Sequence, residues 1–216
     1  MSKKYNTEET IKAILDVSTQ LFVEKGYEKT TIQDIVNNLD GLSRGAIYHH
    51  FQSKEEIIDG VIKRLVPNTK YIDAISNRKD LNGLEKMQHL LLETLLNKEV
   101  GTSFGLTYSL FNNPKFFMLY MRNSCEVLSP QIEAYIIEGN QDGSLSVKFP
   151  KQIGEIVVLL LNTWFTLALF PNTVDTFWDK IQASKYVLDS IGVNILSDEI
   201  ISRIKHEIKE KEGKHE

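Results

Sequence analysis

Residues 30–56 read TTIQDIVNNLDGLSRGAIYHHFQSKEE, and this stretch contains three helix starts in close succession. At the first start, Thr31 and Asp34 have the spacing of a capping box, in which each side chain accepts a hydrogen bond from the other residue's free backbone N–H. Asp40 and Gly41 supply turn chemistry, so the first helix is predicted to end near residue 39. Its apolar residues share one helical face: Ile32, Ile35, Val36 and Leu39.

A second short helix is predicted from Arg44 to Phe51, and the hydroxyl of Ser43 can cap its start. Ile47 and Phe51 are four residues apart, so they share the buried side of this helix. The other side is left free for a partner and carries Arg44, Gly45, Tyr48 and His49.

A third helix follows directly, because Ser53 and Glu56 have the S-x-x-E spacing of a full capping box. Its apolar pattern continues to residue 65 and stops before Pro67, whose ring would clash with the carbonyl four residues back in a helix. A helix, a tight turn and an exposed second helix form a helix-turn-helix, which sets its second helix into a DNA major groove.

The same positions resemble a known family. The matching residues are Thr31-Ile32 with Asp34-Ile35, Gly41-Leu42-Ser43 with Gly45, Ile47-Tyr48 with Phe51, and Ser53-Lys54-Glu55-Glu56. Together with Leu21 to Tyr27 upstream, they are similar to the N-terminal signature of the TetR family of bacterial transcription factors, over about residues 7–60. The sequence departs from that signature at Asp40, which is one residue more than the family usually has before the Gly-x-Ser turn.

The resemblance implies an all-α, homodimeric transcriptional repressor. It places a three-helix DNA-binding domain at about residues 1–56 and a helical body for dimerisation and ligand binding at residues 57–216. In such a protein, an unidentified small-molecule inducer bound in the body releases the dimer from a palindromic operator in double-stranded DNA. The operator sequence, the regulated genes, the ligand and the choice between repression and activation are left open.

The predicted DNA contacts lie in and beside the second helix. Arg44 presents a guanidinium fork that can bind guanine in the major groove, and contact with phosphate alone is the alternative. Gly45 would let the backbone approach the groove closely. Tyr48 and Lys54 resemble the family's phosphate-binding positions. The complete predicted set is Thr31, Gln33, Ser43, Arg44, Gly45, Tyr48, His49 and Lys54.

The charge of the chain argues against a protein that coats nucleic acid non-specifically. The net charge is −4, and residues 1–64 hold nine Lys and Arg against ten Asp and Glu. A site-specific dimer can still bind through a few well-placed phosphate contacts. The single cysteine excludes an internal disulfide framework. The polar N-terminus lacks an apolar signal segment, so a cytoplasmic protein is the expectation.

Residues 153–170 are the most apolar stretch of the chain. A charged residue, Glu155, and the stop at Pro171 leave an uncharged run shorter than the roughly 20 residues that cross a bilayer, so no membrane partner is predicted. A helix that is apolar nearly all round is explained by burial on two sides. The resemblance implies that residues 153–170 and 175–193 form a four-helix interface with a second copy of the chain.

Aromatic side chains gather in the middle of the chain, where they can form a core or line a ligand pocket between helices. The resemblance favours an inducer pocket without identifying the ligand. The residues predicted to contact the ligand are Phe104, Tyr108, Phe111, Phe117, Tyr120, Met121 and Trp164.

Other functional classes fit the sequence less well. Gly41 to Gly45 matches the G-x-S-x-G pattern of a hydrolase, but that motif needs a β-strand before Ser43, and residues 36–40 are not rich in β-formers. The adjacent His49 and His50 cannot both hold one metal from a helix, so no enzyme, metal or cofactor is predicted. The alternative of a helical ligand-binding or scaffolding protein that has lost DNA binding stays open. Residues 1–64 carry more acidic than basic residues and contain the additional Asp40.

Overall fold

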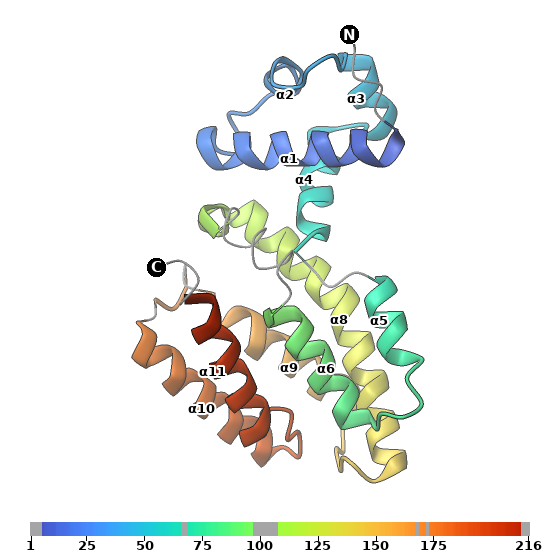
Figure 1. Ribbon diagram of the computed structural model, residues 1–216, viewed down its shortest axis with the longest axis vertical. Coiled ribbons are helices and arrows are strands. Elements are labelled where there is room, and N and C mark those ends of the chain that lie inside the picture. The colour runs from blue at the N-terminus through green and yellow to red at the C-terminus, as the bar shows by residue number, and fades with distance from the viewer. Residues whose placement is uncertain (1–5, 66–68, 97–107, 167–168, 172, 213–216) are drawn as a thin grey trace. The chain divides into compact units, whose positions relative to one another are not determined.

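The computed structural model describes residues 6–65, 69–96, 108–166, 169–171 and 173–212, and every regular element among them is a helix. Figure 1 shows these helices along the chain. The all-α prediction is therefore confirmed. The chain divides into two compact units. Unit 1 covers residues 1–65 and 102–120, and unit 2 covers residues 66–101 and 121–216.

Unit 1 contains the predicted helix-turn-helix, built on one longer helix. Its helices are α1 (Thr7–Lys25), α2 (Ile32–Asn37), α3 (Arg44–His50) and α4 (Lys54–Lys63), with the 3₁₀ helix η1 (Tyr108–Asn112). Helix α1 packs against α2, α4 and η1. One apolar side chain or more from each of the four α-helices is completely buried: Ile14, Phe22, Ile35, Ile47, Ile57, Ile58 and Ile62.

The end of η1 and the start of α8 (Pro114–Asp142) complete the core of unit 1 with aromatic rings. Phe111 meets Phe116 edge to face at 5.3 Å between ring centroids, and it meets Tyr120 at 4.9 Å. All three side chains are buried. The first turns of α8 therefore belong to unit 1, while the rest of this helix belongs to unit 2.

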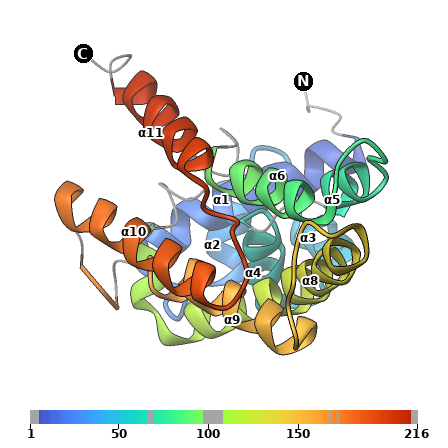
Figure 2. The same cartoon turned by 90° about the horizontal axis from the view of Figure 1, so that it is seen from below.

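Unit 2 is a bundle that combines the rest of α8 with α5 (Thr69–Ser76), α6 (Gly83–Leu96), α9 (Pro150–Thr163), α10 (Val174–Ser190) and α11 (Asp198–Glu212). Helix α6 packs beside α5 and α11, and α9 packs against α10 (Figures 1 and 2). Helices α6 and α8 cross very closely, because a Cβ on Gly83 would lie 2.3 Å from the backbone nitrogen of Gly139.

Several helix boundaries differ from the sequence prediction. Helix α2 ends at Asn37 rather than near Leu39, and α5 is not predicted at all. The sequence also predicts a helix from Lys115 to about Glu138, kinked at Pro130, and a turn over residues 139–144, whereas α8 extends from Pro114 to Asp142. Gly139 therefore lies inside α8, where a Cβ would meet the side chain of Leu145 at 2.7 Å, whereas Gly143, with φ +84°, is the residue that ends the helix.

Helix α9 is shorter than the predicted helix at residues 153–170. It begins at Pro150, a residue that suits the first position of a helix. It ends at Thr163, after which Thr166 N donates to Thr163 O and Leu169 N donates to Thr166 O, both with the three-residue spacing of turns. No helix in the described part of the chain is long and apolar enough to cross a membrane. Pro67 lies outside the described residues.

Candidate functional site

The start of α2 is held by the predicted capping box. Thr31 Oγ1 accepts from Asp34 N at 3.1 Å, and Asp34 Oδ2 accepts from Thr31 N at 2.9 Å. Lys25 Nζ also donates to Asp34 Oδ1 at 2.9 Å. The bond from Lys25 and those from Thr31 hold the pKa of the Asp34 carboxyl well below its usual range. Gln33 is exposed on this helix, and its side-chain amide donates to Asn37 Oδ1 at 2.9 Å.

Helix α3 is anchored on one side and open on the other. Ser43 Oγ accepts from Ala46 N at 3.2 Å and so caps the helix, while Ile47 is fully buried. Gly41, with φ +78°, makes the turn that leads into the cap. The remaining predicted contact residues of this helix are all exposed: Arg44, Gly45, Tyr48 and His49.

Arg44 and Tyr48 form a pair on the exposed side of α3. Arg44 Nη2 donates to Tyr48 Oη at 3.3 Å, and the guanidinium carbon lies 5.5 Å from the centroid of the tyrosine ring. The Tyr48 side chain is 41% exposed. The pair places a cation with several further donors and a phenol hydroxyl side by side, which suits contact with guanine edges and phosphate oxygens.

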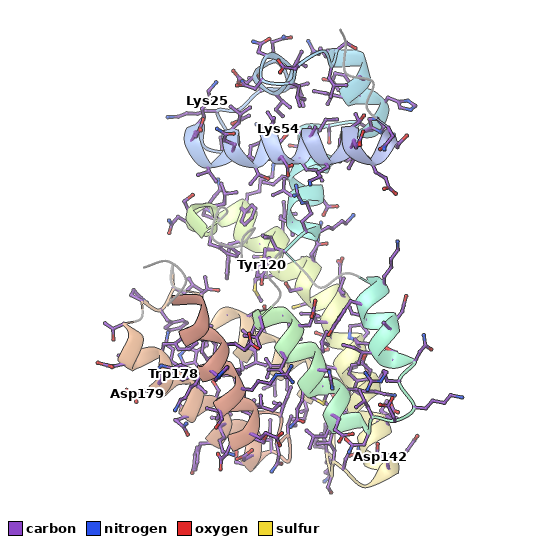
Figure 3. The ribbon with its side chains drawn as sticks, in the orientation of Figure 1. Lys25, Lys54, Tyr120, Asp142, Trp178 and Asp179 are labelled. Atoms are coloured by element: carbon purple, nitrogen blue, oxygen red, sulfur yellow. The ribbon has the colours of Figure 1, made fainter. Side chains whose placement is uncertain are left out.

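Lys54 points into unit 1 rather than away from it (Figure 3). Its ammonium donates to the carbonyl oxygens of Tyr27, Glu28 and Thr30 at 2.8, 3.3 and 2.9 Å, which accounts for all three of its N–H donors. It also lies 4.4 Å from the centroid of the Tyr27 ring. Lys54 therefore ties the first turn of α4 to the loop that leads into α2, a structural role that the sequence did not indicate.

A second lysine reaches the same tyrosine from α8. Lys115 Nζ lies 3.3 Å from Tyr27 Oη, 3.3 Å from Glu55 Oε1 and 4.8 Å from the centroid of the Tyr27 ring. The Tyr27 hydroxyl donates to Glu55 Oε1 at 3.1 Å, and burial raises the pKa of this hydroxyl. Tyr27 thus connects the α1–α2 loop, α4 and α8. No signal in the sequence marks Lys115, because its partners are 60 or more residues away.

The residues predicted to contact a ligand do not form one group. Phe111 and Tyr120 belong to the buried aromatic core of unit 1, and Tyr120 is labelled in Figure 3. Phe117 is half-buried in unit 1. Met121 and Trp164 are half-buried in unit 2, where Thr163 Oγ1 contacts Met121 Sδ at 3.6 Å. Phe104 and the side chain of Tyr108 lie outside the described residues.

A cavity of about 60 Å³ lies in unit 2 among other side chains. Its walls come from α6, α8 and α9 and from the segment that joins α10 to α11. The sequence predicts one helical stripe of Leu84, Met87, Leu91 and Leu95. A stripe at helical spacing does not distinguish a solid core from the wall of a cavity. Side chains of the wall include Met87, Leu91, Leu128, Ile132, Val157 and Ile195.

Other kinds of chemistry find no support in the described residues. No group of three His, Cys, Asp or Glu side chains among them could hold a metal ion. Ser43 follows a helix and a turn rather than the strand that a nucleophile elbow requires. Burial, together with the charges of Glu155 and Glu126, raises the pKa of the Cys125 thiol, which disfavours the reactive thiolate.

Comparison with known proteins supports the interpretation of unit 1 as a helix-turn-helix unit. Residues 14–61 match the family described as bacterial regulatory proteins, tetR family. The chain is 27% identical over 149 residues to the HTH-type transcriptional repressor KstR2 of Mycobacterium tuberculosis, which covers 63% of this chain and 73% of that protein. It is 22% identical over 157 residues to IcaR of Staphylococcus aureus, a negative transcriptional regulator of the biofilm operon icaADBC, covering 73% of this chain and 83% of that one.

Among solved structures, the crystal structure of a transcriptional regulator from Aquifex aeolicus VF5 is similar over most of the chain. It is 27% identical in sequence, covers 83% of this chain and 99% of that one, and superposes with a TM-score of 0.51. The similarity therefore extends beyond the helix-turn-helix into the helical body.

Proposed function

This chain belongs to the TetR family of bacterial regulatory proteins, and we propose that it is a dimeric repressor, released from a palindromic DNA operator by a small-molecule ligand. The observation that carries the proposal is the exposed face of α3. A short helix capped by Ser43 and anchored by Ile47 presents Arg44, Tyr48 and their neighbours on its free side. A helix of this kind can enter the major groove of DNA.

In this proposal the predicted contact residues have two kinds of role. Arg44 reads a base edge or a phosphate, Tyr48 contacts phosphate, and Gly45 permits close approach of the backbone. Lys54 acts differently, as a positioning residue: by holding the carbonyls before α2, it fixes the helix-turn-helix on α4. Residues 1–64 carry a net charge of only −1, so affinity depends on these few contacts.

The second copy of the chain binds through α9 and α10 in this proposal. Each of these helices carries large apolar side chains that are exposed in one copy, including Leu159 at 49% and Tyr186 at 79%. Ile156 and Val187 are exposed beside them. Apolar side chains gathered on two packed helices are typical of a protein interface. A two-fold dimer would address half-sites about 34–36 Å apart, or a multiple of that distance.

The ligand acts by population shift. It releases DNA to the extent that it binds the DNA-free conformation more tightly than the operator-bound conformation. Helix α8 is suited to connect the two functions, because its first turn is bonded to Tyr27 and Glu55 in unit 1 and its later residues line the cavity in unit 2.

The test is selection of bound double-stranded DNA from a random pool by the full-length protein, at two salt concentrations. Enrichment of a palindrome whose binding weakens with salt is expected from a site-specific dimer. If no sequence were enriched even at low salt, the alternative of a helical ligand-binding protein without specific DNA binding would replace the proposal. The small excess of acidic residues in residues 1–64 and the additional Asp40 are the features that favour that alternative.

Variants of the selected complex then locate the interface. Replacing both Arg44 and Tyr48 by Ala should abolish specific binding while the dimer stays intact, and unchanged affinity would refute the placement on α3. Arg44→Lys separates the two roles of Arg44, because lysine keeps the charge but loses the bidentate fork. A base contact predicts relaxed preference at one base pair of each half-site, whereas a phosphate contact predicts unchanged preference.

A further inference from the structure

We propose that the cavity in unit 2 binds a neutral, apolar small molecule, one whose buried part is a hydrocarbon chain or ring. This inference adds the chemical class of the ligand to the proposed function. It rests on that function only for the effect of the ligand on DNA binding. The binding itself depends on the walls of the cavity. Ten of the twelve residues that line it are apolar.

The two polar residues of the wall are already bonded to the main chain. Thr94 Oγ1 donates to Leu90 O at 2.8 Å, and Asn162 Nδ2 donates to Val158 O at 3.1 Å. The described wall contains no ionisable side chain. A charged ligand would lose its hydration there without gaining a counter-charge, so the cavity selects against carboxylates and ammonium groups.

The volume and the position of the cavity also favour a ligand. About 60 Å³ is several times the roughly 10–15 Å³ that one water molecule needs. Water is a poor occupant, because it requires two to four polar partners and the wall offers few. Leu95 both lines the cavity and is 44% exposed, so one wall reaches the surface of unit 2 and provides a route of entry.

Helix α8 contributes to the wall of the cavity and also begins in unit 1. Leu128 and Ile132 of α8 line the cavity, and Lys115 in the first turn of the same helix bonds to Tyr27 and Glu55. A ligand that displaces the middle of α8 therefore acts on a helix whose beginning is fixed to the helix-turn-helix.

Titration calorimetry of the full-length protein with two matched series of probes tests the inference. One series contains straight-chain 1-alcohols from butanol to octanol, and the other contains the carboxylates of equal length at pH 7. We expect the affinity for alcohols to rise about fourfold per added methylene, which corresponds to ~0.8 kcal/mol, until the cavity is full. The affinity for each carboxylate should be lower than that for the alcohol of equal length by about tenfold or more.

Variants show where the alcohols bind. Leu95→Trp should block the entrance and lower alcohol affinity by about tenfold or more, whereas Ile137→Trp is the matched control, because Ile137 is 41% exposed on α8 and does not line the cavity. Leu161→Ala enlarges the cavity, so the longest chain that still gains affinity should become longer. This second variant gives a result even where Leu95→Trp does not fold.

Three results would overturn the inference: no binding of any of the alcohols, equal binding of alcohols and carboxylates, or binding that Leu95→Trp and Leu161→Ala leave unchanged. The selected operator gives a separate measurement. If the alcohol-free protein bound no operator, the proposed function would be contradicted. If it bound the operator but no alcohol, only the assignment of the cavity would be contradicted.

Discussion

Lys115 Nζ lies 3.3 Å from the carboxylate of Glu55, so the first turn of α8 is paired with the first turn of α4. The two residues are also joined through Tyr27, whose hydroxyl lies within hydrogen-bonding distance of both. Lys54, the neighbour of Glu55 in α4, donates to three carbonyls around the same tyrosine. Tyr27 is therefore held by two lysines with different partners, and their contributions to stability can be separated.

Lys54→Met should destabilise unit 1 more than Lys115→Met. The first change leaves three carbonyl acceptors without their donor, at a cost of about 1–3 kcal/mol. The second removes an ion pair whose partners are both largely exposed, and such pairs stabilise little. Hydrogen exchange of residues 7–65 is the appropriate measurement, because both tryptophans, Trp164 and Trp178, lie in unit 2.

The same pair of variants decides the role of Lys54 at DNA. If Lys54 contacted a phosphate directly, Lys54→Met would reduce the salt dependence of operator binding by about one phosphate contact and leave exchange in unit 1 unchanged. The positioning role predicts the opposite combination. Hydrogen exchange in unit 1 should be faster, and the salt dependence of operator binding should stay close to that of the natural protein.

Local signals explain why the helix-turn-helix could be predicted so closely. The caps at Thr31, Ser43 and Ser53 each use an oxygen and an N–H within three residues of each other, so their sequence spacing is enough to indicate them. The buried side of α3 follows in the same way from the position of Ile47 within one short helix.

Features that depend on distant residues were missed or misplaced. Gly139 indicated a turn, yet it lies within α8, where its backbone passes close to Gly83 of α6. Lys54 resembles a phosphate contact in sequence, and nothing there indicates that the carbonyls of residues 27–30 accept its hydrogen bonds. The cavity could not be predicted either, because its walls come from elements as far apart in sequence as Met87 and Ile195.

Acid should weaken the contribution of Asp34 to the stability of unit 1. The pKa of this carboxyl is lowered by Lys25 and Thr31 in the folded protein, whereas in an unfolded chain it is near 3.9. The contribution is therefore complete above about pH 4 and is lost as the pH falls through the folded pKa. Hydrogen exchange of the natural protein and Asp34→Asn should differ clearly at pH 6, and the difference should become smaller on acidification toward pH 3.

Asp40→Asn is the control for this comparison, because Asp40 is an exposed residue in the turn before α3. It should change stability by no more than about 0.5 kcal/mol. A difference for Asp34→Asn that stayed constant from pH 6 to pH 3 would show that the ionised carboxylate does not stabilise the start of α2.

Gly83→Ala should strongly destabilise unit 2. The new Cβ would lie 2.3 Å from both Gly139 N and Tyr135 O, and these are backbone atoms that cannot move aside without separating α6 from α8. A loss of about 3 kcal/mol or more is expected, in the range of severe core changes. Urea denaturation followed by tryptophan fluorescence reports unit 2 directly, and a midpoint within error of the natural protein would contradict the close crossing.

Leu159→Glu should dissociate the proposed dimer. The side chain is 49% exposed on α9, so a charge there is harmless to the single chain but is unfavourable once a second copy buries it. Sedimentation equilibrium should give the mass of a monomer, with operator affinity reduced as a consequence. Ile137→Glu on α8 is the control and should stay dimeric. A variant Leu159→Glu that remained fully dimeric would place the interface elsewhere.

Gly45→Ala separates folding from DNA approach at the recognition helix. A Cβ at this position would meet only Ser43 Oγ, at 3.7 Å, so the fold accommodates it. Alanine in place of glycine in an exposed helix adds about 0.5–1 kcal/mol of stability. If the backbone of α3 lies close to the groove edge, the same methyl group would contact DNA, and operator affinity should fall by about tenfold or more although the protein is more stable. Unchanged affinity would mean that α3 approaches through its side chains alone, with Gly45 set back from the groove.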